Sequence, residues 1–209
     1  MTPWRPPITE ATFAQHLIVL AAREPEGRPV GEAGGVYQWD RLAYVAEWAA
    51  ENLPGDFCEI GCYAGGMTTR LAAIARRHGR KVIAIDPFPA GTPYRLAEEV
   101  RGVFAYEIAP WPEIEWHEVD GNTSAAAKAI GERRLCFGFA DATKEHEHVR
   151  AQLATLMAAS DGPVCVDDAY VPDVLRAADE RARESGGAWT HLRVSHLRET
   201  WLVRHTVGA

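Results

Sequence analysis

Three aspartates are the residues of this sequence best suited to chemistry. Asp141 follows one short apolar run, and the adjacent pair Asp167 and Asp168 follows another. Both runs are typical of strands buried in a parallel sheet. Because the carboxyl ends of parallel strands meet at one edge of the sheet, we expect the three carboxylates to converge there.

Three converging carboxylates favour a metal site. Left bare, they would repel one another and raise each other's pKa. A divalent cation removes that repulsion, and hard oxygen ligands without a nearby histidine pair favour Mg²⁺ over zinc. The alternative is that Asp168 caps a helix near Pro172 and that Asp141 caps the helix that follows it.

A glycine-rich turn, Glu59 to Gly66, follows an earlier apolar run and precedes a helical segment. Small residues let the backbone turn tightly and approach a ligand. A pyrophosphate site favours G-x-G-x-x-G. The glycines here are Gly61, Gly65 and Gly66, a spacing better suited to a nucleoside joined to an amino acid.

Polar residues at three strand ends fit such a ligand. Glu59 could accept a hydrogen bond from an ammonium group, and Asp86 could accept both ribose hydroxyls. Asp120-Gly121-Asn122-Thr123 could meet an adenine edge. Each feature alone could be a tight turn or a cap, but their order along the chain favours a nucleoside site. The residues expected to contact this ligand are Glu59, Gly61, Tyr63, Gly65, Asp86, Pro87, Gly121, Thr123 and Asp141.

The elements that position these residues alternate between strands and helices. This alternation predicts a Rossmann-like, doubly wound α/β sheet of seven strands, ending in an antiparallel hairpin. We expect an N-terminal helical extension and loop over residues 1–38, with a helix at Thr9–Ala22, and one domain over 39–209 whose first helix starts near Asp40. The expected strands are Phe57–Ile60, Val82–Ile85, Trp116–Val119, Leu135–Ala140, Val164–Val166, Trp189–Val194 and Thr200–Thr206.

Composition narrows the possible partners. The 209 residues are 47% apolar and 24% charged, as in an ordinary globular protein. A net charge of −7 disfavours nucleic acid and anionic membranes as partners. No apolar run suggests a membrane span, and Met1 to Pro7 does not suggest a signal peptide, so we expect a cytoplasmic protein with reduced cysteines. A zinc site at Cys58 and Cys62 lacks the usual paired spacing.

The glycine-rich turn resembles that of a known enzyme family. Glu59-Ile60-Gly61-Cys62-Tyr63-Ala64-Gly65 resembles the donor loop of catechol O-methyltransferases, including the tyrosine. Gly55-Asp56-Phe57-Cys58-Glu59 with Gly65-Gly66 is similar to macrocin-type O-methyltransferases, methyltransferase family 24. The resemblance spans roughly Asp40 to Thr206 and implies a class I fold that binds S-adenosylmethionine.

The resemblance also implies roles for single residues. Metal-binding carboxylates of the family match Asp141 and Asp167, and the position of Asp168 is Asn in the catechol type and Asp in the macrocin type. Lys144 matches the position of the catalytic base. The macrocin type more often has Asp and His where this chain has Thr143 and Lys144, so His146 and His117 remain alternative bases.

These inferences predict a metal-dependent O-methyltransferase. It would transfer a methyl group from S-adenosylmethionine to a hydroxyl of a small molecule, such as a natural product, sugar or phenol, in secondary metabolism. Catalysis would depend on Asp141, Lys144 and His146. Aromatic residues between Pro87 and Pro112 would cover the acceptor or form a homodimer contact. The alternatives are an NAD(P)-dependent oxidoreductase and a non-catalytic nucleoside or metal-binding module.

Overall fold

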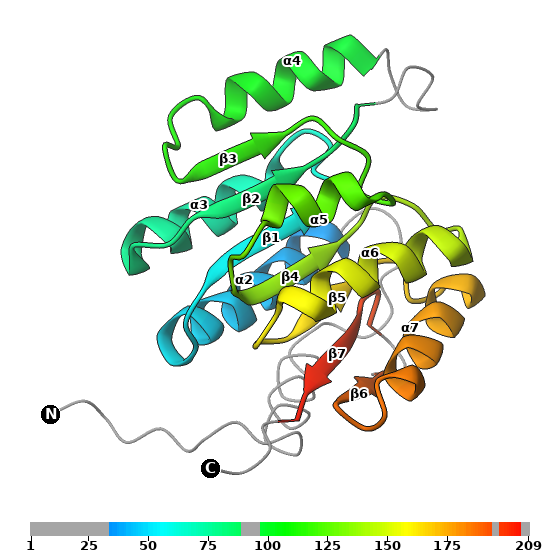
Figure 1. The fold of residues 1–209 in the computed structure, drawn as a ribbon. Coiled ribbons are helices and arrows are strands. Elements are labelled where there is room, and N and C mark those ends of the chain that lie inside the picture. Colours follow the sequence, from blue (N-terminus) through cyan, green and yellow to red (C-terminus); the bar gives the residue numbers. More distant parts are fainter. Residues whose placement is uncertain (1–33, 89–96, 194–196, 206–209) are drawn as a thin grey trace, which may run out of the picture.

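The computed structural model describes residues 34–88, 97–193 and 197–205 (Figure 1). The helix expected at Thr9–Ala22, most of the expected N-terminal extension and part of the Pro87–Pro112 segment lie outside these residues.

A seven-stranded sheet forms the centre of the molecule (Figure 1). The strand order is β3-β2-β1-β4-β5-β7-β6. Neighbouring strands are parallel except for β7, which runs antiparallel to both β5 and β6. The strands are β1 (Asp56–Ile60), β2 (Val82–Ile85), β3 (Ile114–His117), β4 (Leu135–Ala140), β5 (Val164–Val166), β6 (Trp189–Leu192) and β7 (Thr200–Arg204). This arrangement confirms the predicted sheet and its C-terminal hairpin.

Helices cover both faces of the sheet. Side chains of α2 and α3 pack on one face against residues such as Phe57 and Phe137. Side chains of α5, α6 and α7 pack on the other face against Ile60 and Ile83. Phe104 of α4 packs against Phe88 and against Trp116 of β3 through tilted and edge-on ring contacts. The helices are α2 (Gly34–Asn52), α3 (Gly66–His78), α4 (Ala97–Ile108), α5 (Ser124–Ile130), α6 (His146–Ala159) and α7 (Pro172–Glu184).

Several predicted boundaries were wrong. Strand β6 ends at Leu192 and β7 at Arg204, each two residues before its expected end. Helix α2 begins at Gly34, not near Asp40, and Asp40 accepts a hydrogen bond from Arg70 of α3 instead of capping the helix. Strand β3 begins at Ile114, which is in register with Val82, two residues before the expected start. The strand ends early because the Val119 N–H turns back to the His117 carbonyl.

The four cysteines are buried and unpaired with one another. Burial raises the pKa of Cys58, Cys62, Cys136 and Cys165, so these groups are neutral thiols. Among the described residues, three or more potential metal ligands come together in one place, and all of them are aspartates. A zinc site at Cys58 and Cys62 therefore gains no support.

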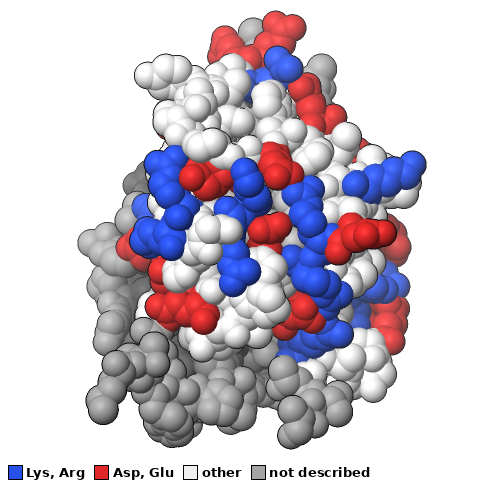
Figure 2. Space-filling view, turned by 60° about the vertical axis from the view of Figure 1, so that its left-hand side comes forward, with Lys and Arg blue, Asp and Glu red and all other residues white. Residues whose placement is uncertain are grey.

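The surface mixes charges of both signs, as the face in Figure 2 shows. Pairs such as Arg76–Glu113 and Arg77–Glu47 join neighbouring elements. Exposed pairs of this kind contribute little to stability. None of the helices in the described ranges combines the length and the apolar character needed to cross a bilayer.

Candidate active site

The glycine-rich turn between β1 and α3 has an unusual backbone. Gly61 (φ 92°), Tyr63 (φ 47°) and Gly65 (φ 86°) all have positive φ, and the Gly65 N–H donates to the Cys62 carbonyl at 2.8 Å. A side chain at Gly61 would collide with the backbone of Asp141 and Ala142, within 2.6 Å. The turn therefore requires glycine at this position and lies directly against the loop that follows β4.

Asp86 stabilises the same turn through hydrogen bonds. Its Oδ2 accepts hydrogen bonds from the Cys62 N–H (2.8 Å) and the Tyr63 N–H (3.0 Å), and its Oδ1 accepts one from the Phe88 N–H (2.8 Å). Pro87 lies between Asp86 and Phe88, and Phe88 also has positive φ (43°). The acid expected to accept ribose hydroxyls thus already holds the glycine-rich turn in shape. Each carboxylate oxygen has lone pairs for further donors.

Glu59 lies at the base of the turn and is buried. Thr68 of α3 donates a hydrogen bond to its Oε2, a contact for which the sequence offered no signal. Burial and the nearby charge of Asp86 raise the pKa of Glu59 to about 8. In this environment the side chain takes up a proton near neutral pH, and a cationic ligand group would favour its ionised form.

Gly121 and Thr123 follow β3 at the same edge. A β-carbon on Gly121 would lie 2.2 Å from Cγ2 of Ile60, so the segment packs closely on the end of β1. Thr123 caps α5 by accepting a hydrogen bond from the Ala125 N–H at 3.2 Å. The structure therefore brings Gly121 beside the glycine-rich turn and gives the Thr123 hydroxyl a structural role.

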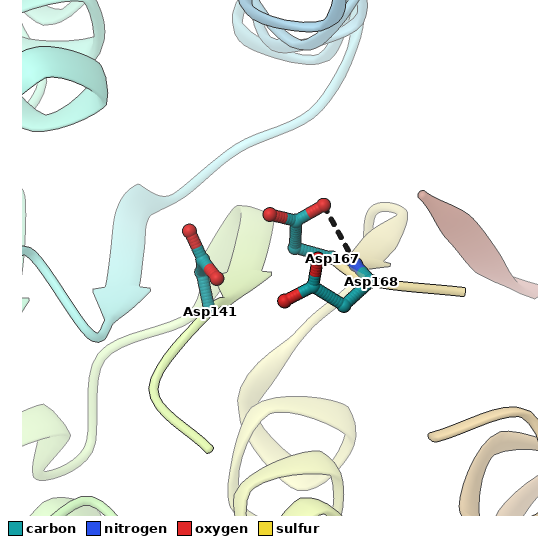
Figure 3. A group of neighbouring side chains, drawn as sticks. All are labelled: Asp141, Asp167 and Asp168. Atoms are coloured by element: carbon teal, nitrogen blue, oxygen red, sulfur yellow. Dashed lines mark hydrogen bonds between the residues drawn. The ribbon is translucent and has the colours of Figure 1, made fainter. Parts of the chain in front are cut away.

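The three aspartates converge as the sequence predicted (Figure 3). One carboxylate oxygen from each of Asp141, Asp167 and Asp168 lies within 4.8 Å of the others. Asp168 has φ 57°, and its N–H donates to Oδ1 of Asp167 at 2.6 Å. Such strain in a residue that is not glycine is typical of functional sites.

The capping alternative for these aspartates is wrong. The N-cap residues of α6 and α7 are Glu145 and Val171, and neither makes a side-chain capping bond. Asp141 and Asp168 instead lie on the strand-end loops and face one another.

Two cations accompany the cluster. Arg198 donates from Nε to Oδ1 of Asp167 at 3.0 Å and pairs through its second nitrogen with Oδ1 of Asp168 at 3.0 Å. Lys144 pairs with Oδ2 of Asp168. Nothing in the sequence singled out Arg198, because it lies thirty residues beyond Asp168, in the connection before β7.

The charges of the cluster act on Lys144 in the opposite direction from that expected of a base. Although Asp141 reaches solvent, desolvation by the surrounding protein and the charge of Asp167 raise its pKa. Partial burial alone would lower the pKa of Lys144, but the bond to Asp168 outweighs it and the pKa is raised. Lys144 is therefore an ammonium in this state, not the partly neutral amine that a base requires.

The two histidines proposed as alternative bases lie in different settings. His146 begins α6 and contacts Glu147 and Glu180, each at 2.9 Å, which directs its ring toward α7. His117 ends β3, and its buried Nε2 has no hydrogen-bond partner. Tyr170, which no sequence pattern indicated, is 56% exposed beside the cluster, and a hydrogen bond to Asp168 raises its pKa.

Comparisons with known proteins agree with this geometry. The profile of a family described as "Methyltransferase domain" matches residues 58–169, which is just over half of the chain. No protein of curated function matches the sequence significantly.

Solved structures share the fold along nearly the whole chain. A TDP-rhamnose 3′-O-methyltransferase of calicheamicin biosynthesis, CalS11, has a TM-score of 0.58 and 15% identity, covering 93% of this chain and 94% of its own. The methyltransferase PaMTH1 of Podospora anserina, solved with SAH, has a TM-score of 0.58 and 13% identity, covering 97% and 99%. A putative caffeoyl-CoA O-methyltransferase from Staphylococcus aureus has a TM-score of 0.61 and 10% identity, covering 95% and 93%.

Proposed function

Because this chain belongs to the methyltransferase-domain family, we propose that it transfers the methyl group of S-adenosylmethionine to a hydroxyl oxygen of a small molecule, with the help of a divalent cation such as Mg²⁺. One observation supports this most directly: the glycine-rich turn and the aspartate cluster touch. The Asp141 N–H donates to the Ile60 carbonyl at 2.8 Å, and Gly61 lies against the backbone of Asp141.

The donor would bind over the glycine-rich turn. Gly61 and Gly65 let the backbone turn with positive φ. Asp86, at the end of β2, would bind the ribose, and Glu59, at the end of β1, would bind the ammonium group. S-adenosylmethionine would supply an electrophilic methyl group. The oxidoreductase alternative finds no support in the family match or in the named structures.

The aspartate cluster fits a hard divalent cation. It offers carboxylate oxygens alone, from the ends of two adjacent strands, and one oxygen of each residue lies within 4.8 Å of the others. Asp141, Asp167 and Asp168 would hold the ion. Such a cation would lower the pKa of a hydroxyl placed against it.

Lys144 would then take the proton of that hydroxyl. Its ammonium is now held by Asp168, which raises its pKa. It can act as a base only after it has released its own proton to solvent, and a divalent cation that neutralises the charge of Asp168 would lower the pKa of Lys144 and so favour that release. This order of events makes proton removal depend on an occupied cluster.

The acceptor would be a small molecule with a reactive hydroxyl, as in a natural product, sugar or phenol. The rhamnose enzyme and the putative caffeoyl-CoA enzyme named above are O-methyltransferases by their descriptions. Tyr170 and Tyr63, both 56% exposed, offer aromatic faces beside the two halves of the site.

Calorimetry tests the donor assignment. We expect purified protein to bind S-adenosylhomocysteine and not NADH. Binding of NADH alone would contradict the proposal. A second titration with Mg²⁺, with EDTA-treated protein as the starting state, tests the metal assignment separately.

A further inference from the structure

Arg198 binds two of the three clustered carboxylates at once. Its Nε lies 3.0 Å from Oδ1 of Asp167, and its Nη2 lies 3.0 Å from Oδ1 of Asp168. The second oxygen of Asp167 points toward Asp141 (Figure 3). The guanidinium therefore neutralises one side of both carboxylates, and the other oxygen of Asp167 faces the centre of the cluster.

The backbone on both sides of Arg198 is fixed. The Arg198 carbonyl accepts a hydrogen bond from the Ala169 N–H at 2.5 Å. The next residue, Glu199, is buried and receives two hydrogen bonds from Arg41 of α2, at 2.7 and 2.8 Å. Leu197 on the other side is also buried. The backbone that carries Arg198 is thus anchored beside the cluster.

Charge balance determines what this arrangement does. The five groups Asp141, Asp167, Asp168, Lys144 and Arg198 carry three negative and two positive charges when all are ionised. One net negative charge then remains to attract a divalent cation. Without Arg198, two would remain, which equals the charge of the ion.

We propose that Arg198 is the resident counter-cation of the aspartate cluster. Arg198 orders the carboxylates in the absence of metal and lowers their affinity for a divalent cation. This inference rests on the metal site of the proposed function. Arg198 makes metal binding weak and reversible, because the ion must share the carboxylates with the guanidinium.

The test measures Mn²⁺ affinity directly, by calorimetry and by the electron paramagnetic resonance signal of free Mn²⁺, on the full chain after EDTA treatment. We expect Arg198→Gln to bind Mn²⁺ about tenfold more tightly than wild type, because tenfold corresponds to ~1.4 kcal/mol, the size of one charge–charge interaction in a partly solvated site. Arg198→Lys keeps the charge and should stay within about threefold of wild type.

Arg134 provides the matched control. It makes the same kind of two-nitrogen contact with Asp161 but lies just before β4, at the opposite end of that strand from Asp141. Arg134→Gln removes an equal charge and should leave Mn²⁺ affinity unchanged. If Arg198→Gln does not fold, Arg198→Met keeps the apolar stem and takes its place; circular dichroism and S-adenosylhomocysteine binding identify the folded variants.

Two results would overturn the inference, and they are distinguishable. Equal or weaker Mn²⁺ binding by a folded Arg198→Gln or Arg198→Met, with wild type binding normally, refutes the counter-cation role alone. Failure of wild type and every variant to bind Mn²⁺ refutes the metal site itself and the inference with it.

Discussion

Gly61 and Asp141 are in backbone contact where β1 and β4 end. A β-carbon on Gly61 would lie 2.5 Å from the carbonyl carbon of Asp141, closer than real side chains approach. The two halves of the site, one for the donor and one for the carboxylates, thus share a border of main-chain atoms. A substitution that displaces these main-chain atoms should therefore affect both halves.

Gly61→Ala should damage both halves. The substitution adds a collision to a left-handed backbone, which together should lower the free energy of unfolding by about 2–4 kcal/mol and weaken S-adenosylhomocysteine binding. Urea unfolding and calorimetry measure the two effects. Gly79→Ala is the control, because Gly79 also has positive φ (64°) but has nothing within 4 Å of the added carbon. Equal effects of the two substitutions would show that the contact with Asp141 is unimportant.

Asp86→Ala should weaken donor binding. It removes the acceptor for the N–H groups of Cys62 and Tyr63 and the acid expected to bind ribose. Hydrogen bonds to a charged group contribute about 1.5–3 kcal/mol, so we expect at least a tenfold loss of S-adenosylhomocysteine affinity by calorimetry. Unchanged affinity would remove Asp86 from the pocket.

Asp141→Asn and Asp167→Asn should separate the metal from the donor. Each removes one carboxylate charge from the cluster, and we expect about a 100-fold loss of Mg²⁺-dependent turnover with donor affinity nearly unchanged. Asp173→Asn, at an exposed position of α7, is the control. Full wild-type turnover in EDTA would contradict the metal's role.

Lys144→Ala should lower turnover more than affinity. Loss of a general base typically costs about 10²–10⁴-fold in rate. Lys144→Arg keeps the positive charge beside Asp168 but cannot give up its proton, so it should be nearly as slow. An arginine variant with wild-type kcat would place the base elsewhere.

Glu59→Gln should change the pH dependence of stability. The pKa of Glu59 is about 8 in the folded chain against 4.5 in the unfolded reference. Between these values the folded state binds the extra proton, so wild-type stability falls as the pH rises from about 4.5 to 8, by roughly 1.4 kcal/mol per pKa unit at most. The neutral amide has no such titration. Thermal unfolding at pH 6 and pH 9 should show a steeper loss for wild type than for Glu59→Gln; parallel curves would contradict the shift.

Local pattern was sufficient to predict most of the fold. Apolar runs such as Leu135–Ala140 became strands because their residues are buried on both faces of the sheet. It failed at the start of α2 and at the bounds of β3. Asp40 contacts Arg70 of α3 instead of capping α2, and the pairing of Ile114 with Val82 sets the start of β3; both partners are distant in the sequence.

The candidate site was also only partly predictable from the sequence. By itself the sequence determined which acids stand at strand ends, since a residue that follows a buried strand must emerge at the sheet edge; this applies to Asp86, Asp141 and Asp167. Only the tertiary structure decided their partners: Thr68 beside Glu59, and Arg198 across Asp167 and Asp168. Hydrogen bonds and ion pairs form between atoms a few ångströms apart. The packing of α3 on β1 brings Thr68 to Glu59, and the pairing of β7 with β5 brings the segment that holds Arg198 to Asp167 and Asp168.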